Sequence, residues 1–147
     1  MSGYLLDTSV LSLIGPDKPP LPGDVADWLR THADELFVPV VAVAEIEKGI
    51  CKLRRAGSTE RVDRLTAWLD ALIQGYGDRI LLLDAPAARA AGRLSDAARA
   101  KGRDPGFADV AIAAIAVTHE LVVLTRNVRH FGPLDVPHVD PLAELPS

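Results

Sequence analysis

Three acidic residues occur where a carboxylate is unexpected. Asp7 follows a short apolar run, Glu45 lies beside the apolar stripe of a helical pattern, and Asp109 lies in a helix rich in Ala and Ile. Carboxylates that meet in one place cannot all stay ionised without a counter-cation. All-oxygen ligands suit Mg²⁺ or Mn²⁺, which use their remaining positions for water and phosphate oxygens. The three acids therefore indicate metal-dependent phosphodiester hydrolysis, in which the metal activates a water as nucleophile.

Each acid also has an ordinary structural interpretation. Asp7 can cap the helix that follows it, Glu45 can be a solvated helical residue, and Asp109 can be an acid favoured at a helix amino terminus. The spacing of the three residues decides little. Their combination carries more weight, provided that the fold brings them to one place.

Apolar runs alternate with helical patterns along the whole chain. The expected strands span residues 4–6, 36–38, 80–83 and 121–124, with an edge strand at 136–139. The expected helices span residues 10–14, 24–32, 40–55, 58–75, 84–101 and 107–117, with Asp24 and Asp84 as amino-terminal caps. This alternation predicts an α/β sandwich with a mostly parallel sheet and an active site at the carboxyl ends of the strands.

Composition narrows the class of protein. The 147 residues are expected to form one domain over residues 1–147, and the single Cys51 excludes an internal disulfide, which favours a reduced, cytoplasmic setting. Neither a signal peptide nor a membrane span is expected. A formal charge of -4 argues against a broad basic field for nucleic acid, unless some of the acids hold cations. No glycine-rich phosphate loop follows the first strand, which excludes a nucleotide-cofactor enzyme.

Four short motifs occur in a characteristic order. They are Leu5-Leu6-Asp7-Thr8-Ser9-Val10, Ala44-Glu45-Ile46-Glu47-Lys48-Gly49-Ile50, Ala108-Asp109-Val110-Ala111-Ile112-Ala113-Ala114 and Leu124-Thr125-Arg126-Asn127-Val128-Arg129-His130-Phe131. Together they resemble the PIN-domain ribonucleases, and among these the VapC toxins of bacterial toxin-antitoxin pairs. The resemblance covers essentially the whole chain, and the four motifs are specific only in combination.

The resemblance implies a PIN-like three-layer α/β/α sandwich and a Mg²⁺- or Mn²⁺-dependent endoribonuclease. It also implies that the protein cuts RNA as a homodimer and is neutralised by a cognate VapB-like antitoxin. Asp7, Glu45 and Asp109 would be the catalytic, metal-binding acids. Thr8 or Ser9 would orient the first carboxylate or a metal-bound water.

The last motif departs from the family pattern. Asn127 stands where many PIN nucleases have a fourth acid; it offers a carbonyl oxygen without charge, which favours one tightly held metal over two. Asp104, in a loop rich in Gly and Pro, is the alternative fourth acid. Arg126 is the expected substrate-binding cation, because it lies beside Asn127.

Two other functions stay open from the sequence alone. A phosphatase in which Asp7 attacks phosphate would resemble the haloacid dehalogenase group, but Ser9 stands where its second Asp is expected. A non-catalytic PIN-like module that binds RNA or another protein would keep the fold without the chemistry. An unused acid cluster would destabilise such a module through mutual repulsion, which favours the enzyme.

Overall fold

Five parallel strands form the centre of the molecule. The structure is a computed structural model that describes residues 2–147. The strands are β1 (Tyr4–Leu6), β2 (Leu36–Pro39), β3 (Ile80–Leu81), β4 (Val122–Leu124) and β5 (His138–Val139). They lie in the order β3-β2-β1-β4-β5, and every pairing is parallel. The predicted parallel sheet is confirmed, with β1 at its centre.

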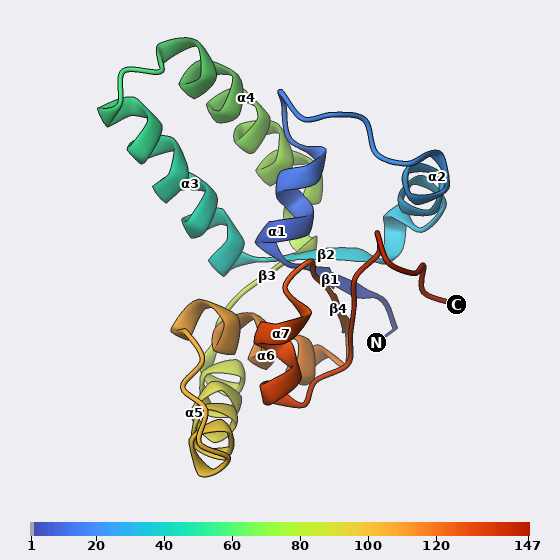
Figure 1. The fold of residues 1–147 in the computed structure, drawn as a ribbon, viewed down its shortest axis with the longest axis vertical. Helices are drawn as coiled ribbons and strands as arrows, with labels where there is room; N and C mark the ends of the chain where they lie inside the picture. The colour runs from blue at the N-terminus through green and yellow to red at the C-terminus, as the bar shows by residue number, and fades with distance from the viewer. Residues whose placement is uncertain (1) are drawn as a thin grey trace.

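Helices cover both faces of the sheet, as Figure 1 shows. On one face lie α1 (Thr8–Leu11), α2 (Gly23–Thr31), α3 (Val40–Arg55) and α4 (Thr59–Tyr76), and on the other lie α5 (Ala85–Ala100), α6 (Phe107–His119) and α7 (Val128–Phe131). Short 3₁₀ turns span Ser12–Ile14, Ala33–Glu35, Gly77–Arg79 and Gly132–Leu134. The predicted three-layer α/β/α sandwich is therefore observed.

Alternating strand residues supply two separate cores. Leu5 and Val123 pack against α5 and α6, whereas Leu6 and Leu124 pack against the helices of the other face. Successive side chains of a strand point to opposite faces of the sheet, so a strand covered on both sides must be apolar at every position. This explains why the strands appear as continuous apolar runs in the sequence.

Helix α6 is buried around most of its circumference. Residues Val110 to Ala116 are all buried, and none of the helices in residues 2–147 is long and apolar enough to cross a membrane. A short turn joins α6 to β4, so the helix runs opposite to the strands and begins at their carboxyl edge. The first turn of α6, with Asp109, consequently lies at the edge where Asp7 follows β1.

Some predicted boundaries were wrong. The strand expected at 80–83 ends at Leu81, because its partner Pro39 is the last residue of β2, and Leu82 is exposed. Asp24 is not a cap: Pro22 occupies the N-cap position, and the Asp24 carboxylate accepts a bond from the next backbone N–H. Asp84 does cap α5, through the N–H of Ala87.

The start of β2 is tied to the end of α4 by one arginine. Arg79 donates hydrogen bonds from one guanidinium nitrogen to the carbonyls of Ala33 (2.7 Å) and Leu36 (2.8 Å), and its guanidinium lies 4.8 Å from the centre of the Tyr76 ring. Burial, opposed by the Arg79 charge, raises the pKa of Tyr76.

Candidate active site

The sheet register places Asp7 beside Thr125. Leu6 pairs with Leu124, and the Asp7 N–H donates to the Leu124 carbonyl at 2.9 Å. The next residues of the two strands therefore leave the sheet side by side at its carboxyl edge. Both are buried: Asp7 is 3% exposed and Thr125 is 0% exposed.

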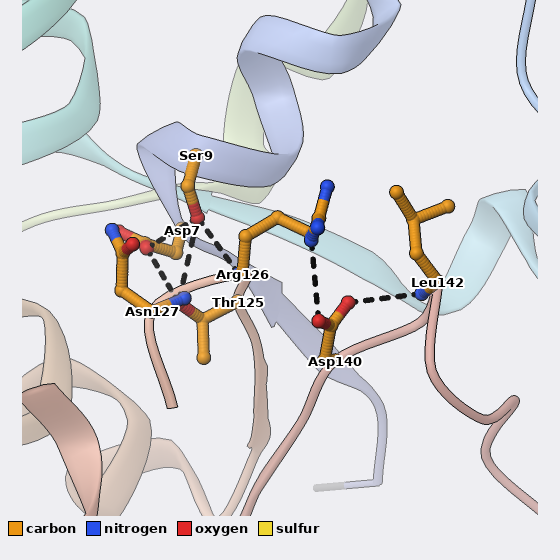
Figure 2. Close-up of polar contacts among 7 residues, drawn as sticks. All are labelled: Asp7, Ser9, Thr125, Arg126, Asn127, Asp140 and Leu142. Carbon is orange, nitrogen blue, oxygen red and sulfur yellow. Dashed lines mark hydrogen bonds and ion pairs between the residues drawn. The ribbon is translucent and has the colours of Figure 1, made fainter. Parts of the chain in front are cut away.

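Two hydroxyl groups hold the same oxygen of Asp7. Thr125 donates to Asp7 Oδ2 at 2.7 Å and Ser9 donates to it at 2.8 Å. Each hydroxyl oxygen in turn accepts a backbone N–H, from Asn127 for Thr125 (2.9 Å) and from Arg126 for Ser9 (3.0 Å). Figure 2 shows this network running from the loop after β4 to the end of β1. An ionised carboxylate oxygen can only accept, so each hydroxyl donates its proton to Asp7 and accepts the backbone N–H with a lone pair.

The other carboxylate oxygen of Asp7 is left for solvent. Oδ1 takes no hydrogen bond from the described residues, and Asp7 makes no capping bond although it occupies the N-cap position of α1. Among residues 2–147, no fully buried side-chain oxygen or nitrogen lacks a partner, so Oδ1 must reach the surface. The capping interpretation of Asp7 is therefore not supported. One oxygen is fixed by the protein and the other is presented outward.

The other two acids each contact one neighbouring side chain. Thr8 Oγ1 donates to Glu45 Oε1 at 2.5 Å, which links α1 to the second turn of α3. His130 Nδ1 lies 3.1 Å from Asp109 Oδ2, which links α7 to the first turn of α6. Glu45 is exposed and Asp109 is half-buried, so both carboxylates remain open to a ligand.

The three carboxylates influence one another electrostatically. Burial, followed by the negative charge of Asp7 and a smaller contribution from Glu45, raises the pKa of the Asp109 carboxyl. The adjacent His130 opposes this shift but does not cancel it. The group formed by Asp7, Glu45 and Asp109 is close enough for the charges of two acids to shift the pKa of the third. It is looser than a chelating cluster, because in the described part of the chain no three His, Cys, Asp or Glu groups are placed to hold one ion together.

Two clefts flank the acids. A cleft of about 430 Å³ is lined by Asp109, His130, Arg129 and the loop 103–106, and a narrower one of about 210 Å³ is lined by Thr8 and Glu45. The rest of the narrower cleft is mostly apolar, with side chains from α3 and α4. One cleft thus has charged and small residues in its wall, and the other has a row of large apolar side chains.

The architecture has a counterpart among known proteins. Residues 4–132 match the PIN domain family. The chain belongs to the PIN domain family. This PIN domain therefore carries its acids on three elements that the fold brings to one edge of the sheet: the end of β1, helix α3 and helix α6.

Toxins are among the PIN-domain relatives of this chain. The toxin FitB of Neisseria gonorrhoeae is 32% identical, over 93% of this chain and 96% of the relative. The crystal structure of FitAcB from the same organism matches with a TM-score of 0.71 and 28% identity, over 94% of this chain and 97% of that chain. The VapC ribonuclease Y4jK of Sinorhizobium fredii is 29% identical, over 93% and 96% of the two chains. VapBC-5 of Mycobacterium tuberculosis, a member of the VapBC family of toxin-antitoxin systems, matches with a TM-score of 0.63 and 28% identity, over 91% and 90%.

The other three residues predicted to belong to the site, Asn127, Asp104 and Arg126, differ in how they lie relative to the acids. Asn127 lies beside Asp7 in Figure 2, and its backbone N–H bonds Thr125. Asp104 lines the same cleft as Asp109. The Arg126 side chain extends away from Asp7 in Figure 2, and its Nε donates to Asp140 at 3.2 Å. The structure therefore brings the Arg126 backbone to the site, but not its guanidinium.

Thr125 is the site residue that sequence reasoning missed. It lies within the last motif, but a threonine after an apolar strand has no feature that marks it as polar machinery. The available signal was positional: Thr125 follows β4 as Asp7 follows β1, and parallel strands end at the same edge. His130, which belongs to the same motif, contacts Asp109.

Proposed function

We propose that residues 1–147 form one PIN nuclease domain that hydrolyses RNA phosphodiester bonds as an endoribonuclease toxin. The observation that carries the proposal is the electrostatic coupling of Asp7, Glu45 and Asp109 at the carboxyl edge of the sheet. The relationship to a VapC ribonuclease supports the same activity. A carboxyl whose pKa is raised by burial and by the charges of neighbouring acids is costly for a fold to keep, and such groups cluster where charge serves a ligand or a reaction.

The donor set fits a hard divalent cation. Asp7, Glu45 and Asp109 supply oxygen only, and Asp7 presents Oδ1 outward while Oδ2 is fixed. Mg²⁺ is commonly held by one or two carboxylates, with water and substrate phosphate completing its shell, so a loose acid group suits it. We expect one Mg²⁺ or Mn²⁺ ion, because Asn127 adds no charge for a second. Bound there, the cation would activate water and stabilise charge on the phosphate.

The side chains around the acids act as positioning groups. Ser9 and Thr125 fix the direction of the Asp7 carboxylate, and Thr8 holds Glu45. Asp104 or Asn127 completes the polar surroundings of the site. A nucleophilic attack by Asp7, as in a phosphatase, fits less well, because two hydroxyl donors already reduce the electron density of its carboxylate.

Cleavage of mixed cellular RNA tests the proposal. We expect the purified chain to cut RNA in Mg²⁺ or Mn²⁺ and to be inactive with chelator, and we expect Asp7→Asn to lose at least about a hundredfold in rate. Glu45→Gln should show a similar loss. Glu47→Gln is the matched control, because Glu47 is exposed on the same helix two residues away, and it should retain full activity.

The result separates the two functions. Metal-dependent cleavage that requires both Asp7 and Glu45 supports the nuclease. A fully active Asp7→Asn variant refutes the mechanism. A folded chain, free of partner, that binds RNA without cutting it under any metal condition would instead identify the non-catalytic module.

We also propose that a VapB-like antitoxin neutralises this chain in the cytoplasm and that the toxin is a homodimer. The toxin relatives support this, and so does the apolar cleft beside Glu45, which suits the side chains of a protein segment. Light scattering should give twice the chain mass of 15.7 kDa for the free toxin. Leu65 is a half-buried residue in the wall of that cleft. Leu65→Glu should therefore weaken the binding of a co-purified antitoxin while leaving RNA cleavage intact.

A further inference from the structure

We infer that Arg103 and Arg129 bind phosphates of the RNA backbone on the Asp109 side of the acids. The inference rests on the proposed nuclease function and gives the path of its substrate. Both arginines line the cleft of about 430 Å³ that Asp109 and His130 also line.

The two sides of this cleft come from different parts of the chain. Arg103 lies in the loop between α5 and α6, and Arg129 lies on α7. Arg129 directly precedes His130, whose ring contacts Asp109 at 3.1 Å. An RNA strand that crosses the acids and continues into this cleft would therefore meet both guanidinium groups close to the scissile phosphate.

Arg103 and Arg129 are more available to phosphate than Arg126, because their side chains have no ion-pair partner in the described part of the chain. Arg126 is engaged by Asp140, at 3.2 Å. Within residues 2–147, neither the Arg103 nor the Arg129 side chain forms an ion pair or a hydrogen bond, and both residues are exposed. An unpaired guanidinium beside a site of phosphate chemistry is available for bidentate contacts to phosphate oxygens. Arg103 and Arg129, on the rim of the Asp109 cleft, are therefore better placed to contact phosphate than the paired Arg126.

The lining of the cleft suits nucleic acid better than a protein segment. Its walls are charged, histidine, proline and glycine residues, without a large aliphatic side chain. The other cleft, beside Glu45, also has the cations Lys18 and Arg61, but most of its wall is made by large apolar side chains: Ile46, Ile50, Leu53, Leu65 and Trp68. Phosphate backbones are held by cations and backbone groups, whereas apolar pockets hold protein side chains. The two clefts therefore have different ligands.

Salt-dependent RNA binding tests the inference. An Asp7→Asn background prevents cleavage, and the probe is a fluorescein-labelled, mixed-sequence single-stranded RNA of about 20 nucleotides, followed by anisotropy. Adding Arg103→Ala and Arg129→Ala should lower the association constant about tenfold at low salt. It should also reduce the slope of log K against log salt by about 1.4, since each phosphate contact contributes about 0.7 for a single strand.

A second double variant controls for net charge. Arg54→Ala with Arg55→Ala removes the same two charges from exposed positions at the far end of α3, remote from α6 and α7 in Figure 1. It should change binding less than about twofold and leave the slope unaltered. Circular dichroism of all variants confirms folding, which changes to these exposed side chains are not expected to affect.

The outcomes are distinct. Equal losses of RNA affinity in the two double variants would overturn the inference. Unchanged RNA binding by Arg103→Ala/Arg129→Ala would also overturn it, and this is the result expected if a protein segment occupies the cleft. Cleavage by the unmodified chain is measured in parallel. Absent cleavage with a preserved arginine effect refutes the nuclease but supports the RNA-binding cleft, and normal cleavage without an arginine effect does the reverse.

Discussion

Replacing Thr125 by valine should destabilise the protein and its site together. Valine keeps the shape of the fully buried side chain but removes the hydroxyl that joins Asp7 Oδ2 to the Asn127 N–H. A hydrogen bond to a charged group contributes about 1.5–3 kcal/mol, and one between neutral groups about 0.5–1.5 kcal/mol. Water can reach the N–H of the exposed Asn127, so the loss of this neutral hydrogen bond costs only about 0.5 kcal/mol. We expect Thr125→Val to lower the free energy of unfolding by about 2–3 kcal/mol.

The measurement is urea unfolding with chelator present, with two controls. Thr125→Ser keeps the hydroxyl and should recover most of the loss. Thr118→Val removes a hydroxyl that bonds the carbonyl of Ala114 on the same helix at 2.8 Å, and should cost less than about 1 kcal/mol. In the nuclease assay, Thr125→Val should lower kcat more than it raises KM, because it frees the Asp7 carboxylate without touching RNA.

A coupling experiment shows whether the effect runs through Asp7. In the Asp7→Asn background the charge-assisted bond is absent, so Thr125→Val should cost about 1 kcal/mol less than in the unmodified chain. If Thr125→Val stays within about 0.5 kcal/mol of the unmodified protein, or costs the same in both backgrounds, the hydroxyl does not hold the carboxylate and the argument fails.

Three further changes test other parts of the structure by thermal unfolding. Asp109→Asn should raise stability without metal at neutral pH, because burial and the Asp7 charge raise the pKa of this carboxyl in the folded protein, so that its ionised form destabilises the fold. The gain should vanish as the pH falls below the pKa of the carboxyl in the unfolded chain, and a gain that persists in acid would contradict the assignment. Asp104→Asn, at an exposed position, is the control. Arg79→Ala should cost about 2 kcal/mol by leaving two carbonyls at the start of β2 without their donor, and a cost under about 0.5 kcal/mol would show that water replaces it. Gly3→Ala should lower the free energy of unfolding by more than about 1 kcal/mol, because φ is +146° and a Cβ would lie 2.6 Å from a backbone oxygen. Gly92→Ala on α5 is the control: its Cβ would meet no atom within 4 Å, so it should stabilise the protein. Similar results for the two variants would refute the steric explanation.

The sheet and its layers were predictable because local and global preferences agree. The strands β1 to β4 are apolar at successive positions, which indicates burial on both faces, and helices separate these strands along the chain. The errors occur where pairing decides the boundary. Leu82 continues the apolar run of β3, yet no neighbour remains to pair with it, because the chain turns from Pro39 into α3. Apolarity indicates that a strand exists, but its partner determines where it ends.

The candidate site was predictable only in part. The three acids stood out because each carboxylate contrasts with its apolar surroundings in the sequence. Thr125 does not contrast in this way, and its role depends on the register that aligns Leu6 with Leu124. The pairing of Arg126 with Asp140 depends on where the chain after β5 returns to the sheet. Such contacts between distant segments have no local pattern, so neither was accessible before the fold was known.

The same architecture that collects the acids also offsets their repulsion. Asp109 is attached to a helix whose following residues are buried, so the apolar packing of α6 holds the carboxylate at the sheet edge against the Asp7 charge. Asp7 is attached to the central strand, and two hydroxyl bonds compensate for its burial. Glu45, on the exposed side of α3, needs only Thr8. Support therefore increases with burial across the three acids. Disturbing the buried contacts should consequently affect both stability and the site, whereas substitutions around Glu45 should affect the site with little effect on stability.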